Sequence, residues 1–314
     1  MEPLVAIVGP TAAGKSALAL HLAQALDGEI VSADSRQVYC HMDIGTAKPT
    51  PEELSLAPHH LINVINPGED FSLAQYQSLA CRAIGDIQRR NKLALLVGGS
   101  GMYAWSVLEG WGIPEVPPDP EFRRSLERKA DEVGGEELYQ ELVAVDPLAA
   151  QRIDPRNVRR TIRALEVYRV TKTPSPQLQR RKEAPFDTLI IGLTADRREL
   201  YRRIDQRVDG MIERGLVAEV EKLVDMGYRF DLPAMSGIGY KEIGMFISGE
   251  LSLATAIQQI KFETHRFVRH QYSWFRLQDD RIKWFDIQNN AGSEITALLA
   301  NFIERLVNRR EEAS

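Results

Sequence analysis

The sequence has few of the residues that mark disulfide-rich, zinc-binding or membrane-spanning proteins. It has two cysteines in 314 residues, Cys40 and Cys81, and neither lies at metal-ligand spacing from a second cysteine or a histidine. This argues against a disulfide framework or a structural zinc site. No run of about 18 apolar residues occurs, and the apolar run near the N-terminus breaks at Gly9-Pro10 without a basic segment before it. We therefore expect a cytoplasmic protein with reduced thiols and no membrane association.

An excess of positive charge is also absent. The net charge is −5, which argues against a uniformly basic nucleic-acid binder but leaves room for local basic patches. The composition, 44% hydrophobic and 26% charged residues, is that of an ordinary globular protein. The length allows one large domain with an insertion, or two domains. No internal repeat or low-complexity segment is present.

What the sequence does contain is a phosphate-binding motif near its start. An apolar run at 4–8, the sequence Gly-Pro-Thr-Ala-Ala-Gly-Lys-Ser at 9–16 and an Ala/Leu-rich helical pattern at 17–26 follow one another. This is the strand, loop and helix context in which G-x-x-x-x-G-K-[ST] forms a P-loop.

The residue types of this motif explain its chemistry. Gly9 and Gly14 permit dihedral angles that turn successive N–H groups toward one point, above the positive end of the following helix dipole. Lys15 adds a mobile positive charge, and Ser16 adds a hydroxyl suited to Mg²⁺. A merely tight strand-to-helix turn would need glycine but not the Lys-Ser pair. The motif therefore predicts a di- or triphosphate ligand, such as a nucleotide like ATP, but no particular reaction.

A second predicted strand, at 28–33, ends at Asp34. Ligands of open α/β sheets bind beyond the carboxyl ends of the strands, so we expect Asp34 at the same rim as the P-loop. There a carboxylate could orient or deprotonate a nucleophile. Alternatively, Asp34 is the N-cap of a helix, with Gln37 as its capping-box partner. Local sequence favours neither interpretation over the other.

A third predicted strand, at 92–97, ends in Gly98-Gly99-Ser100-Gly101 without an acidic residue. Many P-loop ATPases hold Mg²⁺ with an aspartate at such a strand end. Its absence weakens a motor or switch function and favours a diphosphate that belongs to a substrate. The glycines either let the backbone approach a ligand closely or only form a strand-to-helix turn.

Further strands are predicted at 186–193 and 282–287, an amphipathic helix at 71–90, two helices within 197–227 and a long helix at 253–277. Ser72 is a plausible N-cap, and 42–49 reads as a loop over the rim of the sheet. For the adjacent His59 and His60, a structural or polar-contact role is favoured over metal binding. The last of these helices interleaves basic and aromatic residues, which suits single-stranded nucleic acid or a buried aromatic face.

Residues 113–184 begin with a proline-rich connector and contain only helical patterns. We therefore predict an α/β protein with a P-loop NTPase-like core, a central, mostly parallel sheet, and an inserted all-helical domain. The core comprises 1–112 and 185–314, and the insertion 113–184.

The second half of the insertion is strongly basic, which indicates either a polyanionic partner or a solvated helix face. Only Asp154 and Glu166 oppose its basic residues, which are Arg152, Arg156, Arg159, Arg160, Arg163, Arg169, Lys172, Arg180, Arg181 and Lys182.

Several separated stretches resemble one family. Besides the P-loop, these are Asp-Ser-Arg-Gln-Val-Tyr at 34–39, Met-Asp-Ile-Gly-Thr-Ala-Lys-Pro at 42–49, Pro-His-His-Leu at 58–61, Leu-Val-Gly-Gly-Ser-Gly-Met-Tyr at 96–103, Arg-Ala-Leu-Glu-Val-Tyr at 163–168 and Gly-Tyr-Lys-Glu at 239–242. Together they resemble tRNA dimethylallyltransferase, the bacterial tRNA isopentenyltransferase. The resemblance covers nearly the whole chain. It implies transfer of a dimethylallyl group from dimethylallyl diphosphate to N6 of the tRNA adenosine 3′-adjacent to the anticodon (adenosine 37), with Mg²⁺ and release of pyrophosphate.

The resemblance also implies roles for individual residues. Asp34 matches the catalytic carboxylate, Lys15 would neutralise charge on the leaving diphosphate, Ser16 would bind Mg²⁺, and Ser100 stands where the family usually has threonine. Ser236 stands where many members carry arginine. The diphosphate would be bound by Gly9, Thr11, Ala12, Ala13, Gly14, Lys15, Ser16 and Arg207. The anticodon stem-loop would be contacted by Asp34, Ser35, Arg36, Gln37, Ser100, Arg159, Arg160, Thr161, Ile162 and Arg163.

Two other functions stay open on the sequence. One is a small-molecule kinase in which Asp34 activates a substrate hydroxyl and ATP occupies the P-loop. The other is a non-enzymatic RNA-binding module that retains a nucleotide-binding loop. We expect the transferase to act as a monomer.

Overall fold

The computed structural model describes residues 2–174, 186–289 and 291–312. The chain forms two compact units. The core unit comprises Met1–Leu108 and Pro185–Ser314, and the helical unit comprises Glu109–Ala184.

The core unit is built on a six-stranded parallel sheet of order β3-β2-β4-β1-β5-β6. The strands are β1 (Glu2–Val8), β2 (Gly28–Ser32), β3 (His59–His60), β4 (Leu93–Val97), β5 (Phe186–Thr194) and β6 (Ile282–Asp286). Residues Leu4–Val8 are fully buried, as expected for a parallel strand covered on both faces. The predicted α/β class and the strand at 282–287 are confirmed.

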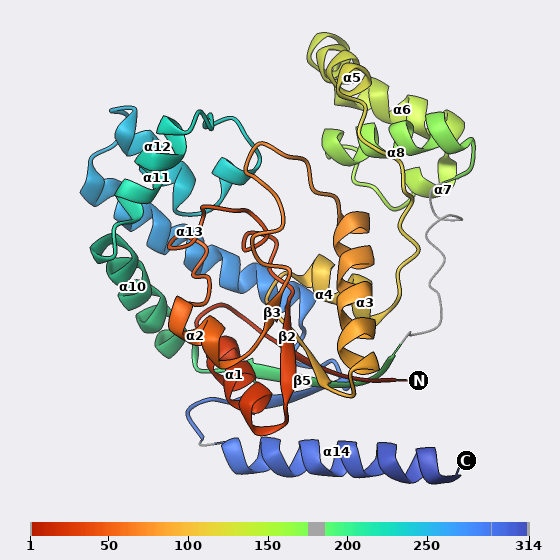
Figure 1. The fold of residues 1–314 in the computed structure, drawn as a ribbon. Helices are drawn as coiled ribbons and strands as arrows, with labels where there is room; N and C mark the ends of the chain where they lie inside the picture. The colour runs from red at the N-terminus through yellow and green to blue at the C-terminus, as the bar shows by residue number, and fades with distance from the viewer. Residues whose placement is uncertain (1, 175–185, 290, 313–314) are drawn as a thin grey trace. The chain divides into compact units, whose positions relative to one another are not determined.

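Helices α1 (Lys15–Ala25) and α3 (Leu73–Arg89) connect the strands around β1. The chain crosses from β1 to β2 through α1, continues to the edge strand β3, and returns from β3 to β4 through α3. Right-handed crossovers in opposite directions place these helices on opposite faces of the sheet, and Figure 1 shows them on either side of it. The predicted Ser72 cap is confirmed, because Ser72 and Gln75 form a capping box. A short helix that we did not predict, α2 (Pro51–Leu56), follows the loop at 42–49.

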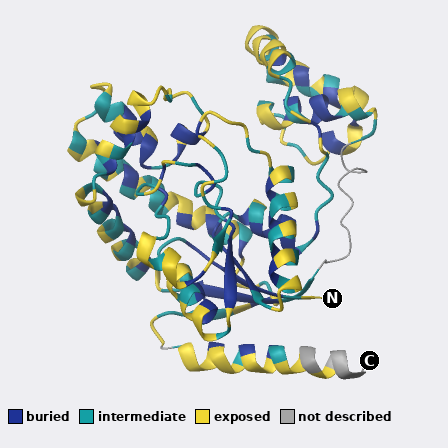
Figure 2. Ribbon diagram, viewed as in Figure 1, coloured by how far each residue is buried: buried dark blue, intermediate teal, exposed yellow. Residues whose placement is uncertain are grey.

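The remaining core helices pack against one another and against β5. They are α4 (Gly101–Leu108), α10 (Arg197–Glu213), α11 (Leu216–Asp225), α12 (Tyr240–Ile247), α13 (Leu253–Trp274) and α14 (Gly292–Glu312), with a short 3₁₀ turn η1 (Ala234–Ser236). Helix α13 contacts α10, α12 and α4, and α14 contacts β5. Figure 2 shows the buried strands and the exposed outer faces of these helices.

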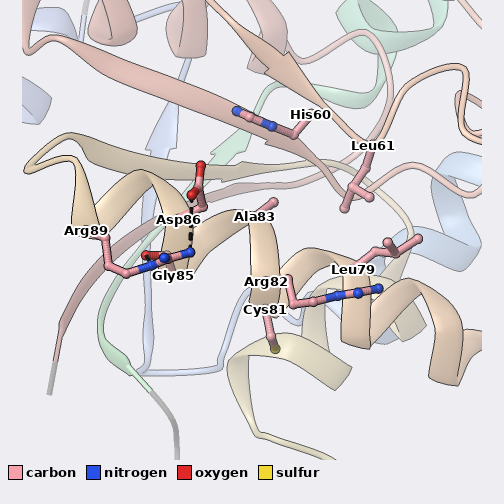
Figure 3. Close-up of a pocket in the computed structure, with 9 residues that line it drawn as sticks. All are labelled: His60, Leu61, Leu79, Cys81, Arg82, Ala83, Gly85, Asp86 and Arg89. Atoms are coloured by element: carbon pink, nitrogen blue, oxygen red, sulfur yellow. Dashed lines mark hydrogen bonds and ion pairs between the residues drawn. The ribbon is translucent and has the colours of Figure 1, made fainter.

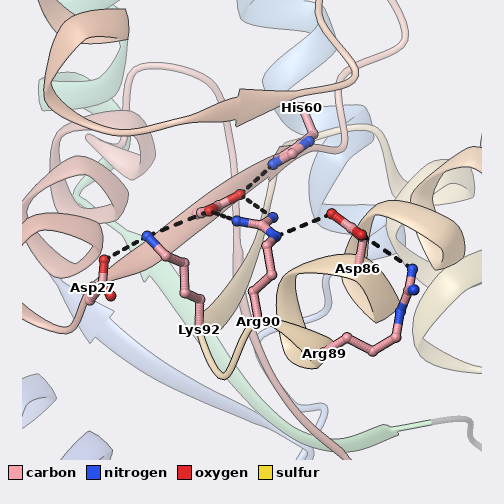
Figure 4. Close-up of polar contacts among 7 residues, drawn as sticks. Asp27, His60, Asp86, Arg89, Arg90 and Lys92 are labelled. Carbon is pink, nitrogen blue, oxygen red and sulfur yellow. Dashed lines mark hydrogen bonds and ion pairs between the residues drawn. The ribbon is translucent and has the colours of Figure 1, made fainter.

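A buried carboxylate organises the edge of the sheet at β3. The Glu29 side chain on β2 is 3% exposed. It accepts a bidentate contact from Arg90 and pairs with His60 at 2.8 Å. Figure 4 shows Arg90 and His60 in this network, with Lys92 reaching Asp27. Hydrogen bonding by Arg90, with a further contribution from His60, lowers the pKa of Glu29 to about 2. His59 Nδ1 lies 2.8 Å from Ala57 O, so both histidines make polar contacts within the protein, as expected.

The helical unit consists of α5 (Pro120–Val133), α6 (Gly135–Val145), α7 (Pro147–Ala150) and α8 (Val158–Thr171) in its described part. Its small apolar core includes Leu126, Leu138, Leu142 and Leu165. The predicted basic residues Arg180, Arg181 and Lys182 lie outside the described residues. In neither unit does a described helix have the length and apolar character that a membrane span requires.

Candidate active site

Parallel pairing brings three strand ends to one rim of the core unit. In the register of the sheet, Val97 of β4 lies opposite both Ile7 of β1 and Ser32 of β2. Hydrogen bonds continue beyond the strands, from Ala33 N to Val97 O at 2.7 Å and from Gly98 N to Ile7 O at 3.1 Å. The P-loop, the segment at Asp34 and the turn at Ser100 therefore lie side by side, as the sequence predicts.

The P-loop has the backbone conformation that a phosphate cradle requires. Gly9, Ala12 and Gly14 have φ values of 130°, 65° and 77°. A Cβ on Gly9 would lie 2.3 Å from the carbonyl oxygen of Leu193, so glycine is required there. Gly14 caps α1, which begins at Lys15. The first N–H groups of α1 thus face the loop with the positive end of its dipole.

Two side chains from distant helices hold Thr11 within this loop. Gln271 on α13, only 3% exposed, accepts a hydrogen bond from Thr11 N at 2.8 Å and donates one to Gly99 O at 3.0 Å. Arg207 on α10 donates to Thr11 Oγ1 at 3.2 Å. The sequence predicts Arg207 only through the family resemblance, and it does not predict Gln271. The one local sign that Gln271 has a special role is that a polar residue occupies an inward position of a helix.

The loop concentrates positive charge. The Lys15 ammonium donates to Pro10 O at 2.7 Å. Burial, with repulsion by Arg207, lowers the pKa of Lys15 to about 8, and the charge of Asp34 opposes this shift. Burial likewise lowers the pKa of Arg207, and Asp34 again opposes the shift. The charges of the three groups therefore act on one another. A bound anion would favour the protonated form of both Lys15 and Arg207.

Asp34 lies in a turn and does not cap a helix. No helix follows it between Ser35 and Val38, and its Oδ1 accepts a hydrogen bond from Arg36 N at 2.8 Å, as in an Asx turn. Gln37 does not return to Asp34. Its amide accepts from Ser32 Oγ at 2.9 Å and donates to the loop at 42–49. The capping-box alternative is therefore wrong, because a turn places Gln37 against other parts of the core.

Ser100 is joined to the same turn. Its Oγ accepts from Ser35 N at 3.0 Å and lies 3.2 Å from Ser35 Oγ. The neighbouring glycines pack against protein. A Cβ on Gly98 would lie 2.1 Å from Ala33 O. A Cβ on Gly99 would lie 2.2 Å from the Gln271 amide, and one on Gly101 would lie 2.2 Å from Trp274. Tight packing of a strand-to-helix turn therefore accounts for these glycines.

A further contact ties the Asp34–Gln37 turn to the chain before α12. Arg36 Nη1 donates to Pro233 O at 2.9 Å. Ser236, at the position where many family members carry arginine, donates its hydroxyl to the same carbonyl at 2.7 Å. The serine thus makes a local turn contact here.

In the helical unit, the structure separates the five predicted tRNA-binding residues into three groups. Arg159 and Arg160 are exposed, with no carboxylate among the described residues within ion-pair distance. Thr161 and Ile162 are buried, at 0% and 3% exposure. Arg163 pairs with the buried Glu166 at 2.5 Å and donates to Val116 O. Helix α8 thus turns the side chains of Thr161 and Ile162 into the core of the helical unit, and the tRNA contacts of this segment stay a prediction.

The donors present at the P-loop fit Mg²⁺ bound together with a diphosphate. Among the described residues no group of three or more His, Cys, Asp or Glu side chains could hold a metal ion. Ser16 is exposed directly after Lys15. Mg²⁺ commonly takes one or two protein ligands and completes its shell with phosphate oxygens and water, so one hydroxyl is a sufficient protein contribution here.

A separate surface depression of about 590 Å³ lies beside α3 at the β3 edge. Figure 3 shows its lining, with Asp86 and Arg89 paired across one turn of the helix at 3.2 Å. None of the predicted site residues lines it. Phe262 and Phe267 on α13 are exposed, whereas Phe275, which caps the C-terminus of this helix, is buried. Neither interpretation of the aromatic residues therefore holds for the whole predicted segment at 253–277.

Comparison with known proteins finds two matching family models and close relatives. The family model for IPP transferase matches residues 37–278, and that for isopentenyl transferase matches residues 2–63. A tRNA dimethylallyltransferase of Dehalococcoides mccartyi is 50% identical over 303 residues, which covers 96% of this chain and 93% of that protein.

Two solved structures are similar over nearly the whole chain. The full-length tRNA isopentenylpyrophosphate transferase from Bacillus halodurans is 40% identical, with a TM-score of 0.73, covering 99% of this chain and 100% of that chain. A eukaryotic dimethylallyltransferase, described as acting on tRNA, is 26% identical with a TM-score of 0.82, covering 97% of this chain and 80% of that chain.

Proposed function

The chain belongs to the IPP transferase family, and from this membership we propose that it prenylates one defined tRNA nucleoside. It transfers a dimethylallyl group to tRNA. We propose that the donor is dimethylallyl diphosphate and that the acceptor is N6 of the adenosine 3′-adjacent to the anticodon, adenosine 37. In this reaction a bond forms between C1 of the dimethylallyl group and N6. The C1–O bond breaks, and its electron pair leaves with pyrophosphate.

The observation that carries this proposal is the shared rim. The phosphate cradle follows β1 and Asp34 follows β2, the two strands on either side of β4, and the charge of Asp34 acts on both Lys15 and Arg207. A diphosphate on the cradle would therefore lie near a carboxylate. That is the arrangement needed to bind the leaving group and orient the nucleophile.

Lys15 and Arg207 stabilise the negative charge that develops as pyrophosphate leaves. Both cations are held in place before substrate binds, Lys15 by Pro10 O and Arg207 by Thr11 Oγ1. Preorganised charges of this kind stabilise a transition state without reorganising during the reaction. Mg²⁺ held by Ser16 and the diphosphate would supply further charge neutralisation.

Asp34 accepts the proton that N6 loses. Its Oδ1 is held by Arg36 N, and a carboxylate has acceptor capacity left at its second oxygen. Neutral adenine N6 is a poor nucleophile, so a hydrogen bond from N6 to this carboxylate assists as the new bond forms. Ser100, bonded to Ser35 N, keeps the turn that carries Asp34 in place.

For RNA binding, we assign the exposed Arg159 and Arg160 of α8 to phosphates of the anticodon stem-loop. Guanidinium groups suit phosphate oxygens. The target adenine must leave its stack to reach a carboxylate at the rim of a sheet, as bases do in other enzymes that modify them.

The test is a reaction with unmodified tRNA, dimethylallyl diphosphate and Mg²⁺, followed by mass analysis of the tRNA nucleosides. We expect one adenosine per acceptor tRNA to gain a dimethylallyl group, with an equal amount of pyrophosphate. ATP with a small alcohol, in place of dimethylallyl diphosphate, serves as the kinase comparison. Unchanged tRNA, or ATP turnover in its place, would refute the proposal.

A further inference from the structure

The loop at 42–49 is the most specific motif that the proposed reaction does not use. It contains no residue assigned to the diphosphate or to tRNA. Nevertheless it is closely held, because the Lys48 ammonium contacts Tyr39 O, Asp43 Oδ1 and Asn63 Oδ1 within 2.7 Å. A loop bonded this extensively has a defined conformation, and the question is what that conformation positions.

The Glu219 carboxylate on α11 binds the tip of this loop. Its Oε2 accepts from Asp43 N at 2.9 Å and Ile44 N at 2.8 Å. Its Oε1 accepts from Gly45 N at 3.1 Å and from the Tyr240 hydroxyl at 2.6 Å. Three consecutive N–H groups around one carboxylate form an anion-binding nest, here filled by a side chain of the protein itself.

The loop fits only without a side chain at its centre. A Cβ on Gly45 would lie 2.5 Å from the ring of Tyr240. The Tyr240 ring, itself 1% exposed, thus forms the floor on which the loop rests, and its hydroxyl completes the shell of Glu219.

The residues next to this tip contact the turn that carries Asp34. The Gln37 amide donates to Ala47 O at 3.2 Å and to Thr46 O at 3.4 Å, and Thr46 Oγ1 donates back to Met42 O at 2.6 Å. Glu219 and Gln37 therefore bind successive residues of one loop, and the loop backbone joins the two sets of hydrogen bonds.

From this chain of contacts we infer that Glu219 is a positioning residue, whose carboxylate sets the Asp34–Gln37 turn through the loop at 42–47. It touches neither substrate, and it acts on the tRNA half of the reaction. The inference rests on the proposed function for its kinetic consequence, but the hydrogen-bond chain itself can be tested without any reaction.

The test compares Glu219→Gln with Glu221→Gln, an exposed glutamate on the same helix. Glutamine keeps the size of the side chain but replaces one acceptor oxygen by a donor, so it repels part of the nest. We expect kcat/KM for tRNA to fall by on the order of 10- to 100-fold, because loosely held catalytic groups cost rate. We expect KM for dimethylallyl diphosphate to stay within about twofold, because the P-loop keeps its own contacts. Glu221→Gln should match the unmodified protein.

Hydrogen exchange gives the second measurement. The amides of Asp43, Ile44 and Gly45 should exchange faster in Glu219→Gln than in the unmodified protein, whether or not tRNA is prenylated. Their exchange rates should be unchanged in Glu221→Gln. If the unmodified protein prenylates no tRNA, the proposed function fails. The exchange rates still show whether Glu219 holds the loop at 42–47. Unchanged exchange and kinetics would overturn the inference, as would equal losses for both substrates. If Glu219→Gln does not fold, Tyr240→Phe decides by the same measurements, with a smaller effect expected because it removes one of four donors.

Discussion

The guanidinium of Arg207 donates a hydrogen bond to Thr11 Oγ1 at 3.2 Å, across 196 positions of sequence. This contact fixes a partly buried cation beside a loop that already holds Lys15. The neighbouring strand β4 ends without a carboxylate, so this second cation adds to the positive charge of the loop, and positive charge favours an anionic ligand.

Replacing Arg207 should weaken donor binding. We expect Arg207→Gln to raise KM for dimethylallyl diphosphate by about 10- to 150-fold. This range corresponds to the loss of one charge-assisted hydrogen bond, which is worth about 1.5–3 kcal/mol. The matched control is Arg202→Gln on the same helix, since Arg202 is exposed and pairs with Glu199. Steady-state kinetics at saturating tRNA measures both. Equal KM values for the two variants would remove Arg207 from the diphosphate site.

Lys15 should make donor binding depend on pH. Its pKa of about 8 lies below the ordinary value of 10.5, so the free enzyme loses this charge as pH rises through about 8. Affinity for inorganic pyrophosphate, measured by calorimetry, should fall over that range. Lys15→Arg should bind more weakly but lose the pH dependence, because arginine stays charged. A flat profile for the unmodified protein would contradict the assignment.

The same shift has a consequence for stability. Between pH 8 and 10.5 the unfolded chain keeps a proton on Lys15 that the folded chain has released, so folding becomes more favourable as pH rises through this window. Below pH 8 the buried charge opposes folding. Lys15→Met should therefore raise the melting temperature at pH 7 while abolishing diphosphate binding, which thermal unfolding with and without pyrophosphate can measure.

Asp34 should affect turnover more than binding. We expect Asp34→Asn to lower kcat by on the order of 10²- to 10⁴-fold, because the amide cannot accept the N6 proton. Its Kd for tRNA should change little. Asp27→Asn is the control, since Asp27 precedes β2 as Asp34 follows it, and its exposed side chain pairs with Lys92. Single-turnover rates and a filter-binding measurement separate the two effects, and a normal rate would exclude Asp34 from the chemistry.

The exposed arginines of α8 should account for part of the salt dependence of tRNA binding. Replacing both Arg159 and Arg160 with glutamine should lower affinity and reduce the slope of log K against log salt by about 1 for each phosphate that these arginines neutralise. KM for dimethylallyl diphosphate should not change. Arg156→Gln, whose guanidinium is already paired with Asp154 at 2.9 Å, should have a smaller effect. An unchanged slope in the double variant would place the RNA elsewhere.

Gln271 should stabilise the core by joining two loops. Gln271→Leu leaves Thr11 N and Gly99 O without their buried partner, which costs about 1–3 kcal/mol for each group left unsatisfied. Denaturant unfolding should show this loss, whereas Gln278→Leu, at an exposed position beyond α13, should not. Equal unfolding midpoints would show that other groups satisfy the two loops.

The family, the main strands of the sheet and the meeting of the P-loop with Asp34 at one rim could be predicted from the sequence, whereas the short helix α2 could not. Buried parallel strands are visible as apolar runs, and the residues that follow them must meet at one edge. The two interpretations of Asp34 could not be separated in this way, because a cap and a turn use the same residue types over the same four positions. The contacts that Gln37 makes outside the turn decide between them.

By itself the sequence determined the P-loop, the strand ends beside it and the helical insertion, because these depend on local conformation and on periodicity. Only the tertiary structure decided that Arg207 and Gln271 hold Thr11, that Glu219 clamps the loop at 42–47, and that Thr161 and Ile162 are buried. Each of these depends on how α8, α10, α11 and α13 pack. A single arginine, glutamine or glutamate in a helix carries no local sign of which distant backbone group it will meet.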